Sequence, residues 1–161
     1  AEFALVFGED GDFSEKAIKA RINGELVNEL GNLVNRSLSL KFKGKILGKQ
    51  ELKVDVKKIE NFVKNFELHR AIEEIFKFVR EVNKYVNDKE PWKLGGKELS
   101  NVLYNIFESL RIISILISAF MPETSEKLNK QLGVKEGKLK DCKFGKFKGK
   151  IKKGEYLFKK V

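Results

Sequence analysis

The chain is poor in several residue types that build catalytic and metal sites. Among its 161 residues are one cysteine and one histidine. A single cysteine, Cys142, excludes a disulfide within the chain, which is typical of proteins from a reducing cytoplasm. Structural zinc sites need about four cysteine or histidine ligands. The lone histidine, His69, has no acid–base partner beside it in sequence. The composition therefore predicts no metal site, and His69 is expected on a helix surface.

Long apolar runs are also missing. The most apolar stretch, residues 112–121, is ten residues long and is interrupted by Ser114 and Ser118. A membrane-spanning helix requires roughly twenty apolar residues. We therefore expect neither a transmembrane helix nor a signal peptide, and we expect this stretch to form a buried core helix.

Lysine is what the chain has in excess. Its 33 Lys and Arg residues against 23 Asp and Glu residues give a formal charge of +10. Residues 133–161 contain 11 lysines and 3 acidic residues, and residues 41–58 contain 7 lysines and 2 acidic residues. The remaining residues are slightly acidic. Such segregated positive charge indicates a polyanionic partner, above all nucleic acid. The alternative is the lysine-rich surface of a heat-adapted protein.

The apolar periodicity indicates an all-α protein. After an extended lead-in over residues 1–12, a helix N-terminus signal at residues 12–15 precedes apolar residues at helical spacing up to Leu38. We expect one helix of about 24 residues there. Further helices are expected from about Asp55, over about 66–86, over about 97–120, and after Pro122, where a proline suits a first helical turn. The prediction is a bundle of four to five helices over residues 13–132.

Two segments lack the helical period. Residues 40–54 alternate polar and apolar side chains around Gly44 and Gly48, which is typical of an extended loop or a hairpin. Residues 133–161 are rich in lysine and glycine. We expect this basic segment to form an extended C-terminal tail that folds back across the bundle.

The first helix places a polar stripe opposite its apolar face. Asn28, Asn32 and Arg36 follow each other at intervals of four residues, with Asn35 beside them. An asparagine amide offers a donor and an acceptor together, and an arginine offers several donors on a plane that can also stack on a base. The stripe therefore suits base recognition, and an ordinary solvated helix face is the alternative.

Trp92 is the second candidate site residue. This single tryptophan follows Pro91 in a polar connector between two expected helices. An aromatic ring on a rigid turn can serve as a platform for an unpaired base. Trp92 could equally fold back and plug the end of the bundle.

Several dispersed motifs together resemble a known family. Asp-Phe-Ser at 12–14, Arg-Ile-Asn at 21–23, Gly-Asn-Leu-Val-Asn-Arg at 31–36, Asn-Lys-Tyr-Val at 83–86, Pro-Trp at 91–92, Leu-Arg-Ile at 110–112, Phe-Met-Pro at 120–122 and the ending Tyr-Leu-Phe-Lys-Lys-Val occur in that order. The chain is similar, over nearly its whole length, to the C-terminal anticodon-binding domain of methionyl-tRNA synthetases, class I enzymes, in an archaeal-like form. Residues 40–54 depart from the family pattern, so the resemblance implies no role for them.

The resemblance implies a function and a set of site residues. The chain is expected to recognise the CAU anticodon of methionine tRNA, with the Trp92 ring stacked on the first anticodon base and with Asn28, Asn32, Arg36 and Pro91 beside the same loop. The family's nucleotide-binding signatures, a pair of histidines and a Lys-Met-Ser-Lys-Ser loop, have no counterpart here. The catalytic domain, with its ATP, methionine and zinc, is expected elsewhere, in cis or as a separate subunit.

Three other functions remain open at this point. The chain could be the anticodon-binding domain of another class I synthetase. It could be a module that joins subunits without touching RNA. An enzyme in its own right is the remaining alternative, which the missing signatures oppose.

Overall fold

The computed structural model describes residues 16–17, 20, 24, 26–40 and 46–147. Over these residues the chain is helical and contains no strand. The α-helices are α2 (Gly31–Leu38), α3 (Val56–Lys64), α4 (Leu68–Lys89), α5 (Gly96–Ile117) and α6 (Pro122–Leu132). Three short turns complete the described part: a π-helical turn η1 (Leu26–Leu30) and two 3-10 turns, η2 (Pro91–Lys93) and η3 (Leu139–Asp141). The predicted all-α bundle is confirmed.

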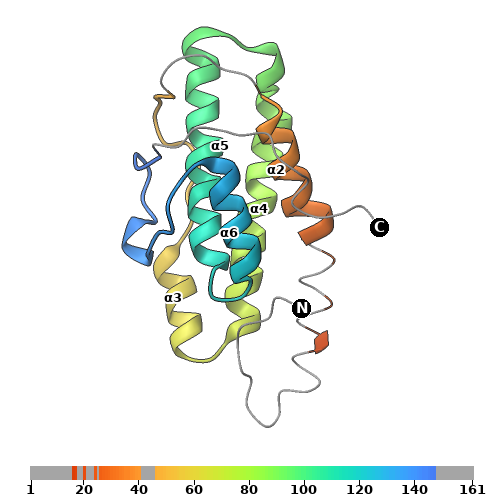
Figure 1. Ribbon diagram of the computed structural model, residues 1–161, viewed down its shortest axis with the longest axis vertical. Coiled ribbons are helices and arrows are strands. Elements are labelled where there is room, and N and C mark those ends of the chain that lie inside the picture. Colours follow the sequence, from red (N-terminus) through yellow and green to blue (C-terminus); the bar gives the residue numbers. More distant parts are fainter. Residues whose placement is uncertain (1–15, 18–19, 21–23, 25, 41–45, 148–161) are drawn as a thin grey trace.

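The long helices α4 and α5 lie side by side and form the centre of the bundle (Figure 1). Helix α2 and the π turn before it pack on α4, α3 packs on the first part of α4, and α6 packs on α5. Turn η2 closes one end of the bundle, where α4 ends and α5 begins (Figure 1). The C-terminal end of α2 reaches the same end, so the two candidate elements of the sequence lie near each other.

Helix α5 supplies most of the core. From Val102 to Ile117 every side chain of this helix except Tyr104 is buried. Its length and composition would also allow it to cross a membrane, but 83% of that stretch is buried inside the bundle. It therefore behaves as the core helix that the apolar run indicated, although the helix ends at Ile117 and not at Phe120. Each fully buried leucine or isoleucine stabilises the fold by about 1.5–3 kcal/mol.

The observed helix ends follow from local chemistry. The Asp55 side chain accepts a hydrogen bond from the backbone N–H of Lys58 and caps α3. Beyond α3, Phe66 adopts a left-handed conformation with φ of 58°, which separates α3 from α4. After α5, Met121 is non-helical, with φ of −142° and ψ of 72°, because it precedes Pro122, and the next helix starts at that proline.

The predicted first helix is only partly within the described residues. Leu30, Leu33, Val34 and Leu38 are buried and Asn32 is exposed, as the periodicity predicted. The five residues of η1 have π-helical geometry, which the sequence pattern did not indicate. The lead-in over residues 1–12 lies outside the described residues.

The two segments without helical period are extended. Residues 46–55 run along α5 without forming a ladder, so the extended loop and not the hairpin describes this part. Residues 133–147 fold back on α5 as expected, apart from turn η3. Residues 41–45 and 148–161, which carry many of the lysines, lie outside the described part.

A buried ion pair on α5 holds the tail. The carboxylate of Glu108 and the guanidinium of Arg111 lie 3.2 Å apart, with only 1% and 7% of their side chains exposed. Arg111 donates hydrogen bonds to the backbone carbonyls of Asp141 and Lys143. Glu108 accepts from the backbone N–H groups of residues 145–147. The pair therefore binds the main chain of the tail and not its lysine side chains.

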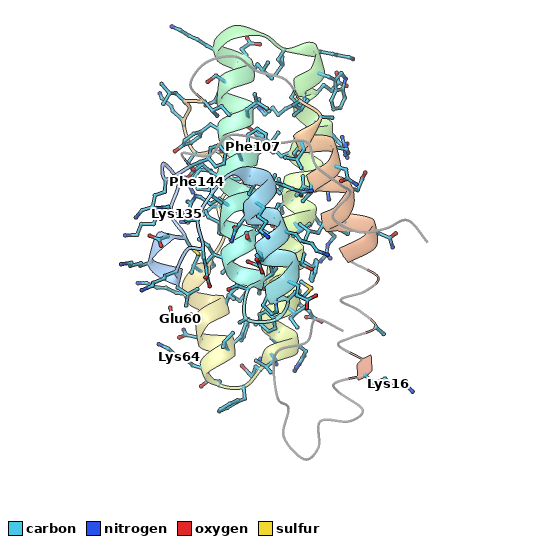
Figure 2. The ribbon with its side chains drawn as sticks, viewed as in Figure 1. Lys16, Glu60, Lys64, Phe107, Lys135 and Phe144 are labelled. Atoms are coloured by element: carbon cyan, nitrogen blue, oxygen red, sulfur yellow. The ribbon has the colours of Figure 1, made fainter. Side chains whose placement is uncertain are left out.

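Aromatic contacts reinforce this attachment. The Phe147 ring stacks on the Phe107 ring with 5.7 Å between centroids, and the Phe144 ring meets Tyr104 edge to face at 5.8 Å. Figure 2 labels one residue of each contact, Phe144 on the tail and Phe107 on α5. Such aromatic pairs contribute roughly 0.5–1.5 kcal/mol each beyond the area they bury.

Candidate nucleic-acid interface

Trp92 projects from the bundle at the end closed by η2. Glu90 ends α4 in a left-handed conformation with φ of 47°, and Pro91 begins the 3-10 turn with its fixed φ. Backbone hydrogen bonds from Lys93 to the Glu90 carbonyl and from Leu94 to the Pro91 carbonyl close the turn. Pro91 is buried, whereas Trp92 is 55% exposed. The ring therefore does not plug the bundle, and a surface remains open for a planar ligand.

Arg36 lies beside the tryptophan although 56 positions separate them in sequence. Its guanidinium carbon is 5.8 Å from the centroid of the Trp92 ring, a cation–π distance. The same guanidinium donates through Nη2 to the Asn87 Oδ1 atom, at 2.7 Å. The elements α2 and η2 are distant in sequence, and together they place a fixed cation next to a flat aromatic ring.

The asparagines of the polar stripe are accessible on the same helical run. Asn32 is exposed on α2 and Asn28 is exposed on the preceding π turn, whereas Asn35 is half-buried. No hydrogen bond to the side chains of Asn28 or Asn32 is found among the described residues. The structure therefore brings Arg36, Pro91 and Trp92 together and leaves Asn28 and Asn32 on the surface that continues from Arg36.

Sequence reasoning missed Asn87. It lies in the last turn of α4 and is exposed, so neither its spacing nor its burial sets it apart from its neighbours. Its role becomes visible only through its contact with Arg36. The sole signal in the sequence was its position five residues before Trp92, in the stretch that was expected to be a connector.

Two ion pairs involve residues that neighbour Trp92 in sequence. Lys93 pairs with Glu90 at 2.7 Å, and Lys89 pairs with Glu51 at 3.4 Å. Burial, followed by the charge of Glu51, raises the pKa of the Tyr85 hydroxyl, which donates to Glu51 at 3.2 Å. This hydroxyl therefore stays protonated near neutral pH and anchors residues 46–52 to α4.

The described residues provide no metal-binding cluster at this surface. Among the described residues no group of three or more His, Cys, Asp or Glu side chains is arranged to hold a metal ion. His69 is exposed in the first turn of α4, as expected. The surface offers stacking and hydrogen bonding, which are the interactions that recognise unpaired bases.

Comparison with known proteins now assigns the family. Residues 49–157 match the family described as the anticodon-binding domain of tRNA ligase. Residues 3–38 match the class I tRNA synthetases of the methionine type. The chain belongs to the anticodon-binding domains of the methionyl-tRNA synthetase family. The expected family is therefore confirmed.

Individual relatives agree with this assignment. The methionine–tRNA ligase of Caldanaerobacter subterraneus is 38% identical over 96% of this chain and 28% of its own length. That of Bacillus subtilis is 32% identical over 96% of this chain and 27% of its own length. A crystal structure of Mycobacterium tuberculosis methionyl-tRNA synthetase bound by methionyl-adenylate is similar, with a TM-score of 0.61 and 30% identity over 74% of this chain and 28% of that one.

The chain thus spans about a quarter of the length of these relatives. All three relatives are bacterial, so they do not test the expectation of an archaeal-like form.

Proposed function

We propose that this domain recognises the CAU anticodon of methionine tRNA on behalf of a methionyl-tRNA synthetase catalytic domain, joined in cis or as a separate subunit. The observation that carries the proposal is the exposed Trp92 ring with the Arg36 guanidinium fixed beside it. The family assignment supports an anticodon as the ligand. ATP, methionine and zinc then belong to the catalytic domain, and the cytoplasm is the compartment.

The geometry suggests how the bases are distinguished. An unpaired first base stacks on the indole of Trp92, and stacking contributes about 1–3 kcal/mol per base without regard to its identity. Identity is read by hydrogen bonds to base edges, for which Arg36 offers donors and Asn32 offers both donors and acceptors. Asn28 extends the same polar surface toward the neighbouring bases. Pro91 contributes by fixing the turn that presents the ring.

Binding to anticodon stem-loops tests the proposal. We expect the protein to bind a CAU stem-loop more tightly than stem-loops that differ only in the first anticodon base. Arg36→Ala should reduce the difference between them, because it removes donors from the reading surface. As a matched control, Arg70→Ala removes an exposed arginine of α4 whose partners are Glu67 and Phe62. Equal affinity of the wild-type protein for all stem-loops would contradict the proposal.

The two binding alternatives give different results in the same assay. The anticodon domain of another class I synthetase would prefer a different anticodon. A module that only joins subunits would bind no stem-loop and would instead associate with a protein.

A further inference from the structure

A hollow lies between residues 47–49 and the beginning of α5, which starts four residues after Trp92. Its lining comprises Leu47, Gly48, Lys49, Gly96, Lys97, Ser100 and Asn101, and its volume is about 680 Å³. We call it the arm hollow. Its walls are mostly apolar, and Leu47, with 67% of its surface exposed, is one of four large apolar residues left open among the described residues. An open apolar surface of this kind marks a contact site.

The extended segment that forms one wall is held rigidly by side chains of α5. The Ser100 hydroxyl accepts from the N–H of Leu47 at 2.9 Å and donates to its carbonyl at 2.8 Å. The Asn101 Oδ1 atom accepts from the N–H of Lys49 at 2.7 Å, and the Asn105 amide donates to the Lys49 carbonyl at 2.8 Å. These side chains supply the backbone hydrogen bonds that a neighbouring strand would otherwise make to an extended segment. The wall therefore exists before any ligand binds.

The approach is so close that only glycine fits at position 48. A Cβ atom there would lie 2.8 Å from the Cα atom of Asn101. Glu51 adds a second attachment, because it accepts from the Asn101 amide and from the Tyr85 hydroxyl. The segment is thus tied both to α5 and to the last part of α4, which leads into η2.

The rim of the arm hollow is positively charged. Lys49 and Lys97 are both exposed, and neither forms an ion pair within the described part of the chain. Of the nearby carboxylates, Glu51 pairs with Lys89 and Glu90 pairs with Lys93. Glu98, in the first turn of α5, is the remaining carboxylate whose negative charge offsets part of the positive charge of the two lysines. An apolar surface flanked by two lysines matches a base or ribose flanked by phosphates.

The spacing allows one RNA to reach both sites. Trp92 and Gly96 are four residues apart, so their Cα atoms lie within about 14 Å even if the chain between them is fully extended. Stacked nucleotides advance by about 3.4 Å each along a strand. The two sites are therefore within roughly four stacked nucleotides of each other, which is shorter than an anticodon arm.

We propose that the arm hollow is a second RNA-contact site, which takes a nucleotide of the anticodon arm close to the one stacked on Trp92. Leu47 packs against its base or ribose, and Lys49 and Lys97 bind the flanking phosphates. We expect little dependence on base identity, because the side-chain amide that lines the hollow, that of Asn101, already binds residues 49 and 51. This inference rests on the proposed function.

The salt dependence of binding tests the phosphate contacts. The affinity for a CAU stem-loop is measured from 50 to 300 mM KCl for the wild-type protein, for Lys49→Ala/Lys97→Ala, and for the control Lys57→Ala/Lys127→Ala. The control removes two exposed lysines of α3 and α6 that form no ion pair among the described residues.

Each lost phosphate contact lowers the slope of log K against log salt by about 0.7–0.9, so two contacts correspond to about 10- to 30-fold in affinity at 0.15 M. We expect this loss in the first variant and none in the control. Equal slopes for the two variants would overturn the proposal.

A second pair of variants tests the apolar contact. Leu47→Ser should weaken binding about three- to tenfold, whereas Leu139→Ser, at an exposed leucine of η3, should not. Trp92→Ala in the same assay separates the two proposals. If binding depends on Trp92 but not on Lys49, Lys97 and Leu47, the arm hollow is not an RNA site and anticodon recognition stands. If the wild-type protein binds no stem-loop, both proposals are wrong.

Discussion

Replacing Trp92 by alanine should weaken RNA binding and should destabilise the fold less than the loss of a fully buried aromatic residue does. The ring is 55% exposed, so somewhat less than half of its surface packs on the protein. For a side chain that buries up to about 250 Å² when it is fully enclosed, the packed part is roughly 100 Å². At about 25 cal/mol per Å² this amounts to about 2.5 kcal/mol. A realistic unfolded chain lowers that figure by about 10–40%, to roughly 2 kcal/mol.

The loss of binding is set by different contacts. A base stacked on the exposed part of the indole contributes about 1–3 kcal/mol, which corresponds to a decrease in affinity of about five- to 150-fold. The fold itself depends on fully enclosed side chains such as Phe107, which is 0% exposed. Phe107→Ala should cost about 3–5 kcal/mol of unfolding free energy and serves as the reference for a structural aromatic residue.

The assay measures the unfolding free energy in urea and the affinity for CAU and variant stem-loops on the same preparations. Arg36→Ala and the double variant complete a cycle. Because the guanidinium of Arg36 lies over the Trp92 ring, we expect the two substitutions to be non-additive in RNA affinity. The reasoning is refuted if Trp92→Ala destabilises the protein as much as Phe107→Ala while the remaining folded protein still prefers CAU. Trp92 would then be a structural residue.

Three further predictions follow from the tail and from the sequence. Glu108→Gln should lower the unfolding free energy, measured in urea titrations, by about 3–5 kcal/mol, because it leaves a buried guanidinium without its partner. The control Glu126→Gln, at an exposed ion pair on α6, should change the unfolding free energy by less than about 1 kcal/mol. Burial raises the pKa of the Cys142 thiol from 9.0 to about 11. Iodoacetamide should therefore alkylate Cys142 about a hundredfold more slowly at pH 8 in the native than in the denatured protein, and faster as the pH rises toward 11; equal rates would contradict the burial. Because the family's nucleotide-binding signatures are missing, the protein alone should catalyse no methionine-dependent pyrophosphate exchange, and exchange above background would disprove this.

The helices could be predicted from the sequence because each is amphipathic at its own length. Apolar spacing predicted helices α3, α4 and α6 and the burial of Leu33, Val34 and Leu38 on α2, because these features depend on local periodicity. Helix ends were less predictable. α4 continues to Lys89 and ends where Glu90 adopts a left-handed conformation. α5 ends at Ile117, and a turn over residues 118–120 leads to Met121, which is non-helical before Pro122. Both limits depend on single residues and not on the pattern.

The candidate site could be predicted in composition but not in geometry. A tryptophan after a proline, and asparagines with an arginine at intervals of four, were visible in the sequence. Neither pattern said that the ring would be exposed or that Arg36 would lie against it, because those facts come from packing α2 beside the end of α4. Asn87 was invisible for the same reason, since its partner is 51 residues away. The roles of Asn28, Asn32, Arg36, Pro91 and Trp92 in RNA binding stay predictions.

The two basic segments, residues 41–58 and 133–161, also show what could not be predicted from the sequence. Their charge was evident in the sequence, but the contacts that hold them involve their backbone and not their lysine side chains. Asn101 and Asn105 bind the backbone of residues 49–52, and the Glu108–Arg111 ion pair binds the backbone of residues 141–147. The described lysines of both segments are thereby left exposed, and among them Lys58 and Lys146 form ion pairs. Because α5 carries both sets of attachments, a change in this core helix is expected to disturb RNA binding through the position of the lysines as well as through stability. Variants of α5 therefore need both measurements before a loss of RNA affinity is assigned to a contact.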